Sequence, residues 1–310
     1  MKKDQLPSFY RQGFEYDCPH GSRKEYSLFH RPRPLNLNEA METALEYLLW
    51  YVPNINSLQS SKNELIEKAL YDEFTFSLIL EEMELTEKDA IFLKFIDDDI
   101  VEYYREAICT RCQKIILTQA DGETKTSSLL RHLRNAIAHG LFNVVDDMLV
   151  AFDMRNYNRE NGTYICSGIM KLYPTHLLKA LSLLESELTH EKLAELAFER
   201  NGYEIIDNDR DNPSLPFDFR MKKERRTYAV EIKKFEIEGI ISPMEVKDIL
   251  GHFPGDTDDR KILIVDSAKL DENAKKQLND EKILLFDQRN IEALLMGEDK
   301  IPKIEKAKKK

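Results

Sequence analysis

Three charged residues in the second half of the sequence have types and spacing suited to the hydrolysis of phosphodiester bonds. Asp218 lies in a segment of alternating apolar and polar residues, and Glu231 and Lys233 lie two apart in a second such segment. Because side chains alternate between the two faces of a strand, Glu231 and Lys233 share a face. Two carboxylates can hold Mg²⁺, which activates a water molecule and neutralises the phosphate, and the lysine can help to deprotonate that water or stabilise the transition state.

The elements that position these residues are two strands joined by a basic turn. Residues 216–220 predict a half-buried strand in which Phe217 and Phe219 face the core and Asp218 faces away. Residues 221–226 form the turn, and residues 227–234 predict the second strand. A hairpin of this kind brings Asp218, Glu231 and Lys233 to one surface. The alternative is a surface hairpin whose charged residues simply lie on its solvent-exposed face.

The order Asp218, then Glu231-Ile232-Lys233, resembles the PD-(D/E)xK restriction-endonuclease-like superfamily. The resemblance implies an α/β fold with a central mixed sheet flanked by helices, over residues 189–298. It implies a Mg²⁺ or Mn²⁺ ion held by Asp218, Glu231 and a glutamate of the opening helix. Glu191 is the expected third ligand, with Glu195 one turn later as the alternative. The same pattern would also fit an inactivated nuclease fold kept for DNA binding.

The flanking pattern agrees with that fold. A helix is expected over residues 189–201, closed by Gly202, followed by a strand over residues 203–206. Further along, strands are expected at 261–265 and 283–286, and helices at 271–278 and 290–295. Pro216 stands two places before Asp218 rather than beside it, a departure that the superfamily tolerates.

A second polar constellation lies on a predicted amphipathic helix over residues 129–140. Its apolar arc comprises Leu129, Leu130, Leu133, Ala136 and Ile137. Arg131, Arg134, Asn135 and His139 fall on the opposite arc. A histidine in the last turn faces the negative end of the helix dipole, which favours its protonated form and suits a proton donor. The alternative is an ordinary solvated helix face.

The run Arg134-Asn135-Ala136-Ile137-Ala138-His139 resembles the signature of the HEPN family, all-α domains that are often ribonucleases. The resemblance implies that two protomers pair as a homodimer and form one composite site without a cofactor. Arg134 would then stabilise the phosphorane, Asn135 would orient the phosphate, and His139 would act as acid or base. Many family members only bind nucleotides or a partner, so a non-catalytic dimerisation and sensing module is the alternative.

An all-α HEPN-like bundle is accordingly expected over residues 38–188. Helices are predicted from Asn36 or Asn38 to Trp50 and over residues 63–84, 86–117 and 174–188, with Thr86 as an N-cap. Residues 148–152 and 164–169 predict a hairpin between the last two helices.

The cysteines could in principle bind zinc. Cys109 and Cys112 have ligand-like spacing, and Cys18 with His20 could complete a four-ligand site. However, Cys109 and Cys112 lie in a helical pattern, where such a pair is commonly part of the core, so zinc is not part of the prediction. Cys166 is expected to pack in a strand.

Length and composition indicate the number of domains and the class of protein. A chain of 310 residues with 42% hydrophobic and 33% charged residues predicts two domains of an ordinary globular protein. Residues 1–37 are expected to form an irregular lead-in. Residues 299–310 are expected to form a basic tail, which is either a frayed terminus or a flexible arm that binds phosphate. No segment resembles a signal peptide or a membrane helix, so a cytoplasmic location is expected, with no membrane partner.

The leading hypothesis is therefore a nuclease that acts on DNA or RNA, in a fusion that resembles prokaryotic antiviral defence proteins. Its net charge of −11 argues against broad, nonspecific binding of nucleic acid by the whole surface, but leaves room for a local basic cleft. The alternatives are a helical half that only senses or dimerises, and an adaptor that binds nucleic acid without cutting it.

Overall fold

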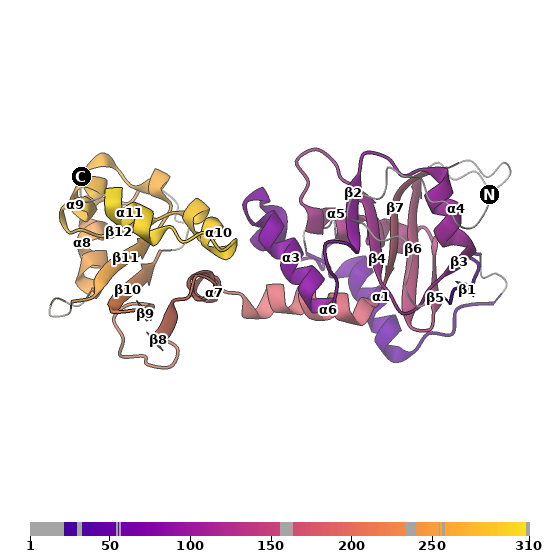
Figure 1. Ribbon diagram of the computed structural model, residues 1–310, viewed down its shortest axis with the longest axis horizontal. Helices are drawn as coiled ribbons and strands as arrows, with labels where there is room; N and C mark the ends of the chain where they lie inside the picture. The colour runs from indigo at the N-terminus through magenta and orange to yellow at the C-terminus, as the bar shows by residue number, and fades with distance from the viewer. Residues whose placement is uncertain are drawn as a thin grey trace. The chain divides into compact units, whose positions relative to one another are not determined.

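The computed structural model describes residues 22–29, 33–53, 55, 57–155, 164–233, 240–253, 255 and 258–307. The chain divides into two compact units, Met1–Glu185 and Ser186–Lys310. Figure 1 shows a sheet with helices in each of them. In the described part of the chain, no helix is long and apolar enough to cross a membrane.

Unit 1 is built on a mixed five-stranded sheet in the order β2-β4-β7-β6-β5. Strands β2 and β4 are parallel, and all the other neighbours are antiparallel. A separate short pair joins β1 (Lys24–Glu25) to β3 (Ala107–Ile108). The five strands of the sheet are β2 (Ala90–Leu93), β4 (Lys114–Thr118), β5 (Phe142–Val145), β6 (Met148–Arg155) and β7 (Ile165–Leu172).

Helices cover both faces of this sheet (Figure 1). On one face, Ile100, Val101 and Tyr104 of α4 pack with Ile116 and Phe152 of the strands. On the other face α5 packs against β4, β6 and β7, α1 and α3 pack against α5, and α6 packs against α1 and α3. The helices of unit 1 are α1 (Glu39–Trp50), α2 (Glu64–Glu67), α3 (Asp72–Glu82), α4 (Asp98–Glu106), α5 (Lys125–Ala138) and α6 (Pro174–Ser182), with short turns of other helix types at Ala69–Tyr71 and Leu183–Glu187.

The predicted all-α bundle is therefore wrong, and the error lies in residues 86–117. This segment forms β2, α4, β3 and most of β4 instead of one helix. Thr86 caps no helix, because its backbone N–H and hydroxyl bond the Asp89 carboxylate in a tight turn. Strand β4 is buried on both faces, so its continuous apolar run carries no period that would distinguish a strand from a helix.

Other predicted elements of unit 1 are present, although the helix predicted over residues 63–84 is divided into α2, a short 3-10 turn and α3. Helix α1 begins after Asn38, whose side chain accepts a hydrogen bond from the Met41 backbone N–H. The predicted hairpin is formed by β6 and β7. The helix expected over residues 129–140 is α5, which starts four residues earlier behind the cap Thr124 and is followed by Gly140 with φ +67°.

Unit 2 is built on a second five-stranded sheet, in the order β12-β11-β10-β9-β8. Strand β9 is antiparallel to both of its neighbours, β8 and β10, whereas β10, β11 and β12 are parallel. The predicted strands and helices of this unit are present with shifted ends, but most of the turn predicted over residues 221–226 belongs to β9 and β10. The strands are β8 (Glu204–Asn208), β9 (Phe219–Lys223), β10 (Arg226–Ile232), β11 (Arg260–Ile264) and β12 (Leu284–Phe286).

Helices lie on both faces of this sheet as well. Ile249 of α8 and Leu278 of α9 pack against Ala229 and Leu263 of the sheet. On the opposite face the Phe198 ring of α7 lies 6.1 Å from the Phe219 ring, centroid to centroid. The helices of unit 2 are α7 (His190–Glu199), α8 (Pro243–His252), α9 (Glu272–Asp280), α10 (Gln288–Leu295) and α11 (Ile301–Ala307).

The expected basic tail over residues 299–310 is wrong for the part that the structure describes. Residues 301–307 form α11, in which Ile301 is buried. The Glu305 carboxylate accepts hydrogen bonds from Arg226 and Arg260 of the sheet strands. Asp299 likewise accepts a hydrogen bond from Lys223, at 2.8 Å. The acidic residues between the lysines therefore anchor this segment to unit 2.

Candidate active site

The β9–β10 hairpin brings the predicted acidic residues together. Phe219 pairs with Val230 across the hairpin, so continuing the register by one residue places Asp218 opposite Glu231. The turn between the strands contains Glu224 with φ 56°. Beyond β10, the Lys233 backbone N–H donates to the Ile264 carbonyl, which keeps this residue aligned with β11.

Glu231 is the buried centre of the site, with 4% of its surface exposed. Its Oε1 atom lies 2.7 Å from Lys233 Nζ and 2.8 Å from His252 Nδ1. A buried carboxylate is costly unless it is paired and hydrogen-bonded, and these two donors meet that need. Both act on the same oxygen atom, which fixes the orientation of the carboxylate.

Asp218 is partly buried beside Glu231. Its Oδ2 atom accepts a hydrogen bond of 2.5 Å from the Ile232 backbone N–H. Burial, followed by the negative charge of Glu231, raises the pKa of Asp218 to about 7. Asp209 and Glu191 contribute further negative charge. The site therefore holds several carboxylates whose mutual repulsion a bound cation would relieve.

The structure separates the two glutamates considered on the opening helix. Glu191, in the first turn of α7, is partly exposed and close enough to Asp218 to raise its pKa. Glu195 is buried, and its carboxylate is bound by Arg210 at 2.6 Å and by Lys192 at 3.1 Å. Glu195 is thus neutralised within the protein, whereas Glu191 adds negative charge to the site.

Two neighbours of the site were missed by the sequence analysis. His252 ends α8, a helix that was not predicted although its sequence carries a clear start signal. Ser242 and Glu245 form a reciprocal capping box there, with Pro243 in the first turn. Asp209 is joined to the site because its backbone N–H donates to the Asp218 carbonyl at 2.9 Å. Nothing local distinguishes Asp209 from the acidic residues around it.

One detail of the predicted strand was wrong. Phe217 and Phe219 do not share a face, because Phe217 packs with Ala229 and Leu263 while Phe219 packs against Phe198. The reason is that β9 begins only at Phe219, so the chain is not yet a regular strand at Phe217. The alternative of a solvent-exposed charged face does not hold either, because Glu231 is buried.

The donor set fits a hard divalent cation that keeps part of its water shell. Within the described ranges, no three His, Cys, Asp or Glu side chains form a complete metal cluster. Mg²⁺ does not require one, since it is usually bound through one or two carboxylates plus water and substrate phosphate. Asp218 and Glu231 are the two carboxylates that could hold such an ion.

Of the three residues predicted from the HEPN-like motif, two bind different partners in unit 1 and the third is exposed. Arg134 Nε donates to the Leu49 carbonyl of α1 at 3.3 Å. Asn135 Nδ2 donates to the Asp153 carboxylate at 3.2 Å, and His139 is exposed at the end of α5. In the part of the chain described, no recorded contact joins Arg134 to His139.

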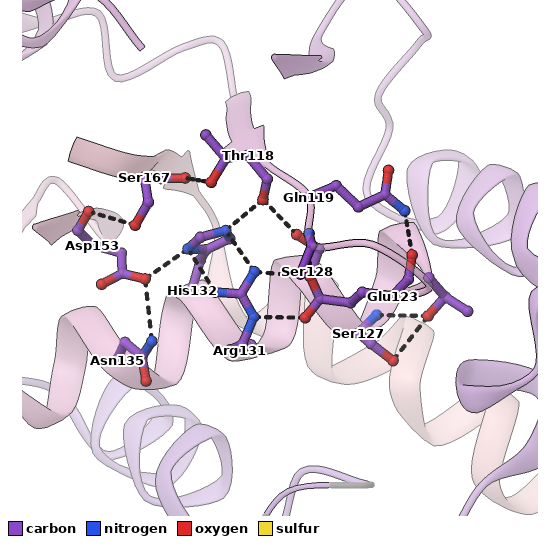
Figure 2. A network of polar contacts seen from close by, with 12 residues as sticks. Thr118, Gln119, Glu123, Ser127, Ser128, Arg131, His132, Asn135, Asp153 and Ser167 are labelled. Atoms are coloured by element: carbon purple, nitrogen blue, oxygen red, sulfur yellow. Dashed lines mark hydrogen bonds and ion pairs between the residues drawn. The ribbon is translucent and has the colours of Figure 1, made fainter. Parts of the chain in front are cut away.

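The histidine within α5 itself is His132, which is not one of the residues of the HEPN-like motif. It is fully buried between α5 and the sheet (Figure 2). Its Nδ1 atom lies 2.6 Å from Asp153 Oδ2, and its Nε2 atom lies 2.7 Å from the Thr118 carbonyl oxygen. The helical period that places Arg131 on the polar arc puts His132 next to the core.

The suggested zinc ligands Cys18 and His20 lie outside the described residues. Cys109 is buried, and the Cys112 sulfur lies 3.0 Å from Lys171 Nζ. Cys166 is buried in β7 as expected, and burial raises the pKa of its thiol to about 12.

Comparison with known proteins agrees with the geometry of unit 2. A family model described as restriction endonuclease matches residues 185–295. That range includes Glu191, Asp218, Glu231, Lys233 and His252. The comparisons with curated proteins and with solved structures give no match.

The chain therefore contains a restriction endonuclease domain of the PD-(D/E)xK-like kind in its C-terminal part. The protein is a nuclease, and nucleic acid is its substrate. Nothing comparable supports the HEPN resemblance, since the match leaves all of unit 1 before Glu185 uncovered and unit 1 contains a five-stranded sheet.

Proposed function

We propose that unit 2 hydrolyses phosphodiester bonds with Mg²⁺ or Mn²⁺ held by Asp218 and Glu231, with Glu191 completing the acidic shell. The observation that carries this proposal is the crowding of Asp218 against the buried Glu231, with the Lys233 ammonium 2.7 Å from Glu231. When bound, the metal ion would neutralise charge on the scissile phosphate and make a water molecule more acidic.

The protein's own residues then have distinct tasks. Glu231 is held in one orientation by Lys233 and His252, so its second oxygen keeps a fixed direction. Lys233 is a catalytic residue in this scheme: its ammonium can orient the attacking water or stabilise negative charge on the phosphate in the transition state. The hydrogen bond from the Ile232 backbone fixes Asp218 beside them.

A cleavage assay with a matched pair of lysine variants tests the proposal. Wild-type protein is incubated with plasmid DNA and with single-stranded RNA, in Mg²⁺, in Mn²⁺ or in EDTA. Lys233→Ala should lower the metal-dependent rate by ~100-fold or more, the scale of loss of a group that acts in the transition state. Lys222→Ala, in the same hairpin and paired with the exposed Glu204, should cut like wild type.

Two results would reject this function. The first is the absence of cutting by wild type on either substrate with either metal, which would favour an adaptor that only binds nucleic acid. The second is a Lys233→Ala rate equal to that of Lys222→Ala. The expected role in prokaryotic antiviral defence rests on fusion with an all-α HEPN-like domain, so it loses its support because unit 1 contains a five-stranded sheet.

The ribonuclease hypothesis for Arg134, Asn135 and His139 has weaker support. It needs Arg134 and His139 to converge, directly or across a two-fold axis between two copies. In one chain Asn135 is held by Asp153, and Arg134 is held by α1. We therefore propose the alternative, in which unit 1 performs no cleavage and senses or pairs instead.

A further inference from the structure

Unit 1 contains a cleft of about 510 Å³ at one edge of its sheet. Strands β2 and β4 are parallel and end at this edge, and β6 ends and β7 begins there as well. Lys94 and Phe95 directly follow β2, Arg155 is the last residue of β6, and Arg131 reaches the cleft from α5. Ligands of open α/β sheets commonly bind outside the carboxyl ends of parallel strands.

The charge of the cleft is opposite to that of the protein. Lys94, Arg131 and Arg155 line it, against one acidic side chain, Asp98. Arg131 is held by Glu123, whereas Lys94 and Arg155 are exposed and show no ion pair to any residue that the structure describes. On a protein with a net charge of −11, such a cluster would concentrate a small anion.

The cleft also presents apolar surface at its rim. Phe95 and Ile165 both line it, and they are 65% and 62% exposed. Tyr164 lies beside them, and its hydroxyl donates to Glu102 at 3.2 Å. Aromatic faces next to cationic side chains are the combination that binds a nucleobase joined to a phosphate, because the base stacks while the phosphate is paired.

The inner wall of the cleft is fixed by a buried hydrogen-bond network (Figure 2). Glu123 holds Arg131 through two bonds, to Nε at 2.6 Å and to Nη2 at 2.8 Å. The Thr118 hydroxyl donates to the Ser167 carbonyl, and the Thr118 carbonyl accepts from Ser128 and His132. A cationic group held in place before the ligand arrives loses little entropy on binding.

We propose that this cleft binds a nucleoside phosphate, with the phosphate at Lys94, Arg155 and Arg131 and the base against Phe95 and Tyr164. The volume lies within the ~300–1,000 Å³ range of small-ligand sites. A wholly apolar ligand would leave the charges of Lys94 and Arg155 without a counter-ion, and free phosphate would make no contact with the exposed apolar rim. The site lies entirely in unit 1, so its existence does not depend on the nuclease function proposed for unit 2.

Calorimetric titration of the full chain in EDTA tests the proposal while the nuclease site lacks divalent cations. The probes are adenosine 5′-monophosphate, uridine 5′-monophosphate, adenosine, inorganic phosphate and a 5′-phosphorylated RNA pentanucleotide. At least one nucleotide should bind with a dissociation constant below 1 mM. The Lys94→Glu/Arg155→Glu double variant should weaken its binding by at least ~10-fold, because two charge-assisted contacts are lost. Lys62→Glu/Arg111→Glu, the same charge change at exposed positions outside the cleft, should bind like wild type.

Phe95→Ala gives an independent measurement, because it should weaken nucleotide binding several-fold without changing the weak binding of inorganic phosphate. Binding of the pentanucleotide alone, lost in the Lys94/Arg155 variant, would support the site and identify a nucleic-acid strand as the source of the nucleotide. The proposal is overturned if no phosphorylated probe binds below 1 mM. It is also overturned if adenosine binds as tightly as its monophosphate, or if the double variant binds like wild type.

Discussion

Glu231 is oriented by two nitrogen donors, and only one of them belongs to the recognisable motif. Lys233 comes from the same strand, whereas His252 comes from the end of α8, twenty-one residues along the chain. Outer residues of this kind hold a ligating group in position and are worth ~10–100-fold in activity or metal affinity. His252 is thus a positioning residue for the candidate active site.

His252→Ala should therefore lower kcat by ~10-fold or more and leave KM for the nucleic acid nearly unchanged, because the substrate-binding surface stays intact. His252→Asn should recover part of the rate, since its amide N–H can donate to Glu231 from nearly the position of Nδ1. Steady-state cleavage kinetics measure both. Equal rates for His252→Ala and wild type, or no difference between the Ala and Asn variants, would show that the contact does not position Glu231.

The ion pair between Glu123 and Arg131 gives a prediction for stability against pH. Burial raises the pKa of Glu123, but hydrogen bonds from Arg131 and from the Ala120 backbone outweigh it and the pKa lies below its usual value. A carboxyl with a lowered pKa stabilises the folded state at pH values above its unfolded pKa of about 4.3, and this contribution disappears as the pH falls through the folded pKa.

Glu123→Gln should therefore destabilise unit 1 by ~1 kcal/mol at pH 7 and by progressively less as the pH is lowered from about 5 to 3. The single tryptophan, Trp50, lies in α1 of unit 1 and reports its unfolding by urea through fluorescence. A difference between the variant and wild type that stays constant over this pH range would contradict the assigned role of the carboxylate.

At the residue scale, the sequence predicted the contacts between residues of one hairpin, but not the contacts between segments that are distant along the chain. Asp218, Glu231 and Lys233 could be selected because strand alternation and one short turn place them together. His252 and Asp209 could not, because their contacts depend on how α8 and the segment before β9 pack in three dimensions.

At the scale of elements, the amphipathic elements were predictable and the fully buried ones were not. Helix α5 shows a clear apolar arc because one side faces the sheet. Strand β4 lies between β2 and β7 and is buried on both sides, so its sequence is a continuous apolar run without the alternation of a half-exposed strand. Its neighbours β2 and α4 add aromatic and aliphatic residues at helix-compatible spacing. The sequence therefore predicted one long helix where the chain folds into strand, helix and strand.

The contact between α5 and β7 depends on a glycine. A Cβ atom added to Gly168 would lie 3.0 Å from Cγ and 3.1 Å from Nδ1 of His132. The ring cannot easily move away, because Asp153 and the Thr118 carbonyl hold its two nitrogens. Gly168→Ala should destabilise unit 1 by ~1–3 kcal/mol, the usual cost of overpacking a rigid core.

Gly251→Ala is the matched control for stability. Gly251 lies within α8, and an added Cβ meets no atom within 4 Å. Alanine is the better helix former, so this change should be neutral or stabilise by up to ~1 kcal/mol. Trp50 fluorescence in urea measures Gly168→Ala in unit 1, and circular dichroism in urea measures Gly251→Ala in unit 2. A Gly168→Ala protein as stable as wild type would mean that the His132 ring is free to shift.

At the scale of the whole molecule, the two units have different chemical character despite similar layered folds. Unit 2 concentrates carboxylates at one edge of its hairpin, as a site for a metal ion requires. Unit 1 concentrates cations in a cleft beside exposed aromatic surface, as a site for a nucleotide requires. Both proposed sites would act on phosphate groups, with unit 2 cutting nucleic acid and unit 1 recognising a nucleotide.

This division predicts a single cutting centre. His139→Ala should cut DNA or RNA at the wild-type rate in Mg²⁺, because His139 is exposed and makes no recorded contact with Arg134 in the described chain. Wild-type protein in EDTA should leave RNA intact, since the carboxylates of unit 2 would then lack their cation. Lys233→Ala should abolish cutting of both substrates together. RNA cleavage that persists in EDTA and is lost in His139→Ala would instead show that α5 carries a second, metal-independent centre, and that unit 1 is itself an enzyme.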